Sequence, residues 1–240
     1  MAGLGTLALM AGGISSAAAW QVFGAGTLAV AVAVCMLTGS EFPEARPARR
    51  KQAMPRTPLP WGAVIAYGAT GIGYVIPATY LPVMARETVS SPLVFGWGWP
   101  LFGAAAFLST LLSARLHAAY SNRQVWAASQ AVMASGLLLP AVYPNIVTVI
   151  AGGLCVGGTF MIITMAGMKE AHRIASVHDV QRHIAALTAA FATGQIVGPV
   201  LAGWLYEATE SFASPLFITS VTLAGPIVVL ARRSALPRSA

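Results

Sequence analysis

Charge is the scarcest feature of this sequence. Only 9% of its 240 residues are Asp, Glu, Lys or Arg, whereas soluble globular domains carry roughly 25%. At the same time 57% of the residues are hydrophobic, and the mean hydropathy is +0.72. This composition excludes an ordinary water-soluble domain and predicts an all-α protein that lies in a lipid bilayer.

Cysteine is also scarce, because the chain has only Cys35 and Cys155. Both lie within apolar stretches, which excludes a disulfide framework and a cysteine ligand set. Two small apolar packing residues are the favoured interpretation.

The hydrophobic residues form six long stretches without any charged residue. A membrane-spanning helix needs about 20 residues. The first and fourth stretches are about twice that length, and each has a break, at "SSAAAWQ" and at "YPNI". We therefore predict a polytopic membrane protein with eight transmembrane helices, at residues 2–19, 22–38, 61–84, 92–114, 124–143, 146–168, 184–206 and 213–231.

The basic residues set the expected orientation. When the eight spans alternate in direction, thirteen of the 14 Lys and Arg residues fall on one side, and only Arg86 falls on the other. This asymmetry predicts that both termini are cytoplasmic, in a bacterial inner membrane. It also explains the net charge of +7 without a nucleic-acid partner. All six tryptophans fall near predicted span ends, as an interfacial belt requires. Cleavage of a signal peptide after "SSAAA" is disfavoured, because the first 40 residues contain no Lys or Arg.

The chain divides into three parts. Residues 1–38 hold two spans, and residues 39–60 are rich in proline and basic residues, which is typical of a solvated cytoplasmic linker. The linker's basic residues also fit binding to lipid headgroups. Residues 61–240 hold six spans and a short tail. Since three spans reverse the chain's direction, the units 61–143 and 146–231 must be inverted relative to each other, which is the inverted-repeat arrangement of many secondary transporters.

Polar and helix-breaking residues mark the expected solute-binding region. Tyr67, Thr70 and Tyr74 recur at i, i+3 and i+7, so they form one stripe on the span 61–84. Aromatic stripes are more often packing surfaces, but hydroxyl groups at lipid depth favour a cavity. Pro77 has Gly73 one turn earlier, which makes a helix bend sterically easy.

The span 184–206 carries a second such group. Gly194 and Gly198 give a smooth face for close helix packing. Pro199 frees the carbonyl group of Gln195, and both polar groups of Gln195 should point inward. A structural hydrogen bond between helices is the alternative role for Gln195. Thr159 is a further candidate lining residue, although a threonine hydroxyl can bond to its own helix.

Several kinds of chemistry are missing from the sequence. No ionisable residue lies at the middle of a predicted span, so a group for proton coupling would have to lie elsewhere, or the carrier is a facilitator. There is no metal motif and no nucleophile–base pair, which excludes the common membrane enzymes. His172, His178 and His183 lie near Glu170 and Asp179, but their spacing favours a solvated loop over a metal site.

Four strings resemble the major facilitator superfamily, in particular a branch of bacterial drug- or sugar-efflux-like permeases. "GIGYVIPATYLPVMAR" resembles the seventh helix of that branch, and "FATGQIVGPVLAG" resembles the eleventh. "AAAWQVFGAGTLAVAVAV" and "ASGLLLP" are similar to its fifth-to-sixth helix turn and its ninth helix. The segment "SARLHAAYSNRQV" lacks the glycine and the acidic residue of the superfamily's cytoplasmic loop motif.

The resemblance implies that the spans are helices five to twelve of a twelve-helix carrier, whose first four helices are missing. Residues 1–38 would be two helices of the N-terminal bundle, and residues 61–240 the C-terminal six-helix bundle. The expected function is secondary, efflux-like transport of a small organic solute by alternating access, without a cofactor. The alternative is a truncated, non-transporting remnant or a structural membrane protein.

Overall fold

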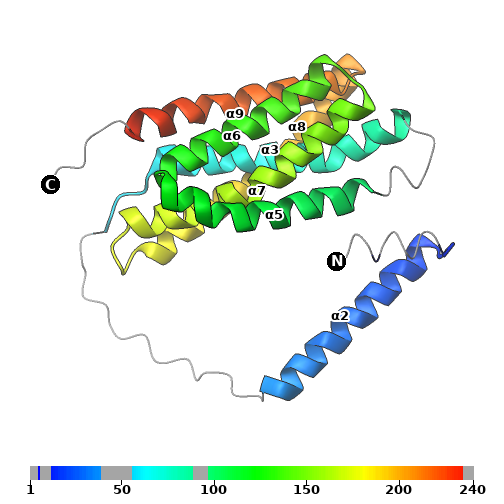
Figure 1. Cartoon of the computed structure of the whole chain (residues 1–240), viewed down its shortest axis with the longest axis horizontal. Helices are drawn as coiled ribbons and strands as arrows, with labels where there is room; N and C mark the ends of the chain where they lie inside the picture. The colour runs from blue at the N-terminus through cyan, green and yellow to red at the C-terminus, as the bar shows by residue number, and fades with distance from the viewer. Residues whose placement is uncertain (1–4, 6–11, 39–55, 89–96, 235–240) are drawn as a thin grey trace. The chain divides into compact units, whose positions relative to one another are not determined.

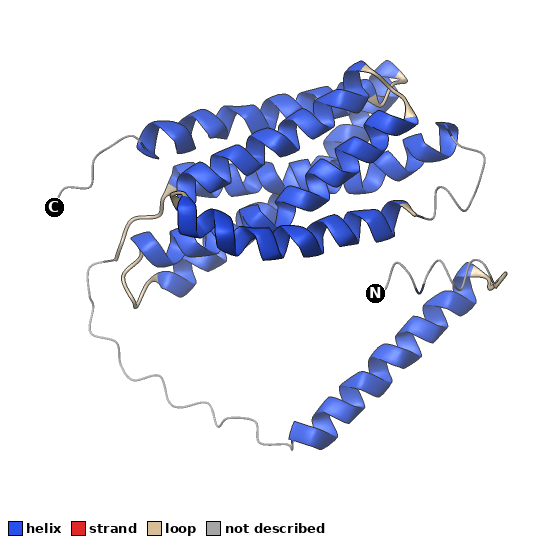
Figure 2. Ribbon diagram, in the orientation of Figure 1, coloured by secondary structure: helices blue, strands red, loops and turns tan. Residues whose placement is uncertain are grey.

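A computed structural model of the chain describes residues 5, 12–38, 56–88 and 97–234, and it is helical with no strand in these ranges (Figures 1 and 2). It divides into two compact units, Met1–Pro55 and Arg56–Ala240. The helices are α2 (Ser16–Thr38), α3 (Trp61–Thr88), α5 (Gly98–Ala119), α6 (Asn122–Val142), α7 (Ile146–Ile174), α8 (Val180–Thr209) and α9 (Ala213–Ser234).

Within the described residues, seven helices are long and apolar enough to cross a membrane. The all-helical, multi-pass architecture is therefore confirmed, but the predicted number of eight spans is not matched. Half of the first expected span, 2–19, lies outside the described residues. The other seven expected spans each correspond to one of the seven helices.

The predicted break at "SSAAAWQ" was placed too late in the chain. Helix α2 begins at Ser16 and runs through Trp20, and the turn lies at Gly12 and Gly13. Gly13 has φ of +70°, which glycine adopts without steric cost. The Ser15 hydroxyl accepts a hydrogen bond from the Ala18 amide at 3.3 Å, so this serine starts the helix instead of ending one.

The second predicted break, at "YPNI", is confirmed. Helix α6 ends at Val142 and α7 begins at Ile146. Between them, the Asn145 side chain accepts hydrogen bonds from the amides of Val147 and Thr148 at 3.0 and 3.1 Å. This cap satisfies two of the amides that every helix N-terminus leaves without a partner.

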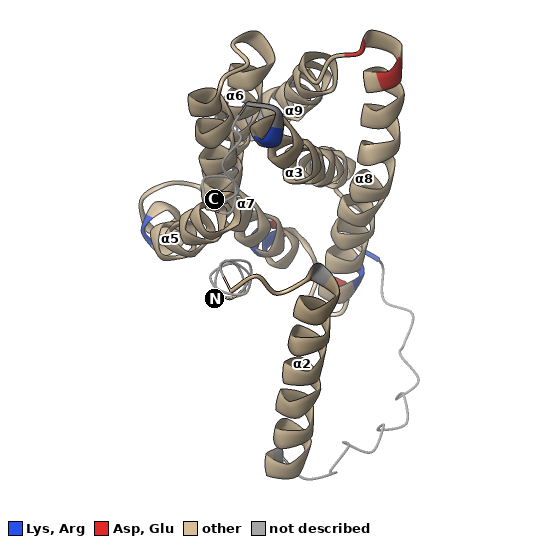
Figure 3. Ribbon diagram, turned by 90° about the vertical axis from the view of Figure 1, so that its right-hand side faces the viewer, with Lys and Arg blue, Asp and Glu red and all other residues tan. Residues whose placement is uncertain are grey.

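The six helices α3 to α9 form the bundle of the second unit (Figure 3). Helix α3 packs on α8 and α9, α7 packs on α5 and α6, and the pairs α3–α7 and α6–α9 also make contact. If α3 is exchanged with α7, α5 with α8 and α6 with α9, this set of contacts stays the same. The α3–α8 contact becomes α7–α5, and the α3–α9 contact becomes α7–α6. Such an exchange is what two three-helix units of opposite direction produce.

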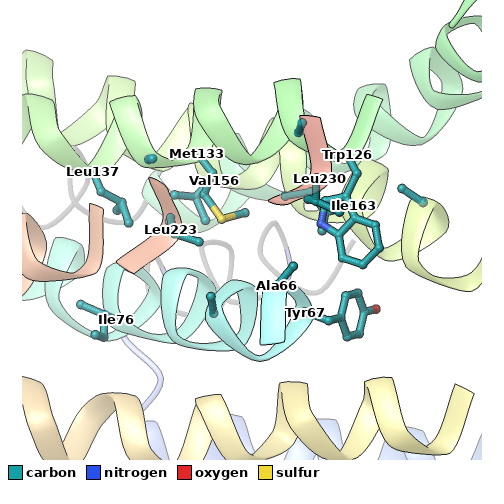
Figure 4. Packing of buried hydrophobic residues seen from close by; sticks show 14 of the residues in the cluster. Ala66, Tyr67, Ile76, Trp126, Met133, Leu137, Val156, Ile163, Leu223 and Leu230 are labelled. Atoms are coloured by element: carbon teal, nitrogen blue, oxygen red, sulfur yellow. The ribbon is translucent and has the colours of Figure 1, made fainter. Parts of the chain in front are cut away.

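The core lies where α3, α6, α7 and α9 meet (Figure 4). Its fully buried side chains include Trp126, Met133 and Leu137 of α6, with Ile163 of α7 and Leu223 of α9. Trp126 differs from the predicted interfacial belt, because it is 0% exposed, whereas the other five tryptophans are 49–78% exposed. Its ring meets the Tyr67 ring edge-on, with centroids 5.9 Å apart. Trp126 is therefore a packing residue inside the protein.

Candidate functional site

Four aromatic rings from four different helices meet inside the bundle. Tyr74 of α3 stacks on Phe160 of α7, with ring centroids 4.3 Å apart and planes 27° apart. The Tyr74 ring also lies 6.2 Å from Phe102 of α5 and 6.3 Å from Phe191 of α8. All four residues are only partly buried. These four residues, which we call the ring cluster, bring α3, α5, α7 and α8 together at one place.

The ring cluster has the same symmetry as the bundle, because its features in α3 and α5 recur in α7 and α8. Gly71 precedes Tyr74 by three residues, and Gly157 precedes Phe160 by three residues. A Cβ atom at Gly71 would collide with the backbone carbonyl oxygen of Phe191, and one at Gly157 would lie 2.8 Å from that of Phe102. Each glycine thus lets a ring-bearing helix approach to backbone contact. The Tyr74–Phe102 and Phe160–Phe191 centroid distances are also nearly equal, at 6.2 and 6.1 Å.

The glycines and prolines singled out from the sequence lie at helix contacts. A Cβ atom at Gly194 would collide with the Gly68 carbonyl oxygen, and one at Gly198 would lie 2.8 Å from Val75. A Cβ atom at Gly73 would lie 2.7 Å from a methyl group of Leu223 in α9.

Both prolines are inside helices. Pro77 lies in α3 and Pro199 lies in α8. The Tyr80 hydroxyl donates to the Pro199 carbonyl oxygen at 3.5 Å, so a side chain of α3 reaches the backbone of α8 next to the proline.

The five predicted solute-binding residues fall into two groups. Tyr67, Thr70 and Thr159 are buried, with exposed fractions of 4%, 1% and 6%. The Thr70 hydroxyl donates to Ala66 of its own helix at 2.9 Å, and the Thr159 hydroxyl donates to Cys155 at 2.7 Å. The hydroxyl groups of Thr70 and Thr159 are therefore already satisfied. Contact of any of the three residues with a solute stays a prediction.

Tyr74 and Gln195 form the second group. Both are partly buried, and neither makes a side-chain hydrogen bond to another described residue. Gln195 follows Phe191 of the ring cluster by four residues, which places the two on one face of α8. Tyr74 and Gln195 therefore keep polar groups that a solute could use.

An apolar cavity of about 100 Å³ lies beside the ring cluster, between α3, α5 and α7. Its walls include Pro77 and Leu81 of α3, Trp99 and Phe102 of α5, and Gly153 of α7. Phe102 belongs to both the cavity and the ring cluster, so the two features are continuous.

A buried charged group lies at the other end of the bundle, where the sequence places its basic residues. Glu170 of α7 is 1% exposed. Its carboxylate accepts hydrogen bonds from Arg123 at 2.7 Å, from Arg173 at 2.7 Å and from Asn122 at 3.1 Å. This group ties α6 to α7, and three donors satisfy the buried carboxylate.

A second polar group at this end joins the segment before α3 to the start of α8. The Thr57 amide donates to the Asp179 carboxylate at 2.6 Å, and Arg182 donates to the Thr57 carbonyl oxygen at 3.1 Å. The hydrogen bond from the Thr57 backbone lowers the pKa of Asp179. Among the described residues, no three His, Cys, Asp or Glu side chains come together as a possible metal site.

Sequence reasoning missed two polar residues between α6 and α9. The Gln130 side-chain amide, 0% exposed, donates to the Leu223 carbonyl oxygen at 3.1 Å. In the other direction, the Ser220 hydroxyl donates to the Ala134 carbonyl oxygen at 2.8 Å. Gln130 gave the same signal as Gln195, because it is a glutamine inside an apolar span.

Comparison with known proteins identifies the family. A family model described as "Uncharacterised MFS-type transporter YbfB" matches residues 1–231. The chain belongs to this family. No curated protein and no solved structure matches the chain. The resemblance to the major facilitator superfamily is thereby confirmed, and with it a multi-pass membrane protein and a transporter. Family membership favours transport over enzymatic activity and over a structural remnant.

Proposed function

We propose that this MFS-type transporter moves a small organic solute by alternating access, in the direction of efflux, across a bacterial inner membrane. The observation that carries the proposal is the stacking of Tyr74 on Phe160, with Phe102 and Phe191 beside them. The rings come from the four helices α3, α5, α7 and α8. Solute sites at the interface of inverted repeats are common in secondary transporters.

The burial of the helices supports the same assignment. In an apolar 18-residue stretch of each helix, the buried share is 11% in α5 and 17% in α8, compared with 56% in α3. Helices α5 and α8 lie on opposite sides of α3 and α7 (Figure 3). The ring cluster between them is therefore partly uncovered, as a site that a solute must enter and leave requires.

The polar groups at the site support an uncharged or weakly polar solute. Tyr74 and Gln195 offer a hydroxyl group and an amide, and no Asp, Glu, Lys, Arg or His lies in α3 between Trp61 and Ala85. A fully charged solute would lose its hydration without gaining a counter-ion there.

The test is transport by the whole chain in vesicles, with a panel of small organic solutes loaded inside. Tyr74→Ala and Gln195→Ala should each lower the flux by about tenfold, since each removes a contact made at the site. Tyr143→Ala is the matched control, because Tyr143 is 67% exposed at the end of α6. Membrane insertion is measured for each variant by its yield in the membrane fraction. Unchanged flux in both site variants would refute the assignment of Tyr74 and Gln195 to the solute site.

A further inference from the structure

The cavity beside the ring cluster has a restrictive chemistry. All its walls are apolar or aromatic side chains or glycine, and no charged side chain of the described residues lines it. An ion placed there would lose its hydration shell without a compensating partner, which is costly. An apolar cavity instead takes up apolar molecules.

The cavity offers aromatic surfaces on the α5 side. The Trp99 and Phe102 rings meet at a centroid distance of 5.8 Å and an angle of 70°, and both line the cavity. Phe102 continues to Tyr74 at 6.2 Å. A flat ring that enters the cavity can therefore make edge-to-face or offset contacts with rings that are already in place.

The α3 side of the cavity offers a hydrogen-bond acceptor. Pro82 has no amide hydrogen, so the carbonyl group of Ala78, four residues earlier, lacks its usual helical donor. Ala78 and Pro82 both line the cavity. In an apolar site, a carbonyl group that has lost its helical donor favours a ligand that brings one donor.

We propose that this cavity binds the aromatic part of an uncharged, planar solute that carries a single N–H or O–H donor. The inference deepens the transport function proposed above, on which it rests, by naming the solute's chemical class. The cavity's volume of about 100 Å³ compares with about 150 Å³ for a cavity that binds benzene. The cavity therefore takes a single ring, and a second fused ring or a larger solute extends toward Tyr74.

Indole is a suitable probe, because it is uncharged and planar and has one N–H donor. The whole chain is labelled with 5-fluorotryptophan in lipid nanodiscs, and indole is titrated while the fluorine NMR spectrum is recorded. The Trp99 resonance is assigned with Trp99→Phe. We expect saturable shifts of this resonance and unchanged shifts for Trp204, which is 66% exposed on α8.

Matched glycine variants locate the binding. A Cβ atom at Gly153 would lie 3.9 Å from Leu81 across the cavity wall, and one at Gly158 would have no atom within 4 Å. Gly153→Phe should fill the cavity and weaken indole binding by about tenfold or more, and Gly158→Phe should leave it unchanged. Gly98→Leu and its control Gly103→Leu provide a second pair, since Gly98 lines the cavity and Gly103 does not.

Analogues of the probe test the class of ligand. Methylation of the indole nitrogen should weaken binding about fivefold, because it removes one hydrogen bond. Indole-3-acetate, an anion, and tetraphenylphosphonium, a cation, should not shift the Trp99 resonance.

If 1-methylindole binds as tightly as indole, or if either ion binds, the proposed chemical class of solute is wrong. Unchanged indole binding in both Gly153→Phe and Gly98→Leu would overturn the site. Because these measurements are of binding at equilibrium, they do not depend on flux. If indole does not bind at the cavity but solute flux is intact, only this inference is refuted. If indole binds at the cavity but no solute is transported, only the proposed transport function is refuted.

Discussion

The Glu170 carboxylate and the Arg123 guanidinium are 2.7 Å apart, with exposed side-chain fractions of 1% and 17%. They connect the last turns of α7 to the first turn of α6. A buried carboxylate is stable only while its donors are present, so this pair holds two helices in one arrangement.

Glu170→Ala should therefore destabilise the bundle by about 3 kcal/mol, because it leaves Arg123 partly buried without its partner. Glu207→Ala, on the exposed end of α8, should be neutral. The measurement is thermal unfolding in detergent. Equal melting temperatures for the Glu170→Ala variant and the wild type would show that the pair contributes nothing.

Gly71→Ala should destabilise the α3–α8 contact by about 1–3 kcal/mol, since its new methyl group meets the Phe191 carbonyl oxygen. Gly158→Ala has open space around it and should gain up to about 1 kcal/mol from the better helix propensity of alanine. Urea or thermal unfolding of both variants in the same detergent compares them. Two variants of equal stability would contradict the close approach of these helices.

The hydrogen bond from Thr57 to Asp179 predicts a dependence on pH. Because this bond lowers the pKa of Asp179 in the folded protein, its stabilising effect is present above the unfolded value of about 3.9 and is lost as the pH falls below it. The melting temperatures of the wild type and of Asp179→Asn should therefore differ at neutral pH and converge in acid. A difference that stays constant down to low pH would rule out this carboxylate as the cause.

The proposed orientation predicts which single cysteines react from outside the cell. In a Cys35→Ser, Cys155→Ala background, cysteines at Tyr143 and Ser211 should react with an impermeant maleimide in intact cells. Cysteines at Ser176 and His178 should react only after permeabilisation, because these positions lie at the basic end of the bundle. The opposite labelling pattern would show that the chain has the opposite orientation in the membrane.

Long apolar stretches made the helices of this protein easy to predict. Their ends were harder, because charge marks the edge of the bilayer and not the end of the helix. Lys169 to Ile174 continue α7 past its expected end at residue 168, and α8 begins at Val180 instead of residue 184.

The candidate site was predictable only in part. Tyr74 was found because a hydroxyl group in an apolar span is unusual. Phe102, Phe160 and Phe191 gave no such signal, since phenylalanine is ordinary in lipid, and their meeting depends on how helices cross. The Glu170–Arg123 pair was missed for a related reason, because the two residues are 47 positions apart and no local pattern connects them.

Within the Tyr74–Phe160 stack, the two halves of the bundle differ by one hydroxyl group. Tyr74 and Phe160 hold equivalent places, yet only the tyrosine ring carries a hydroxyl group. A molecule lying across the stack meets a polar rim on one side and bare hydrocarbon on the other. Its two orientations are then unequal in energy, so an asymmetric cargo would travel with a fixed end leading.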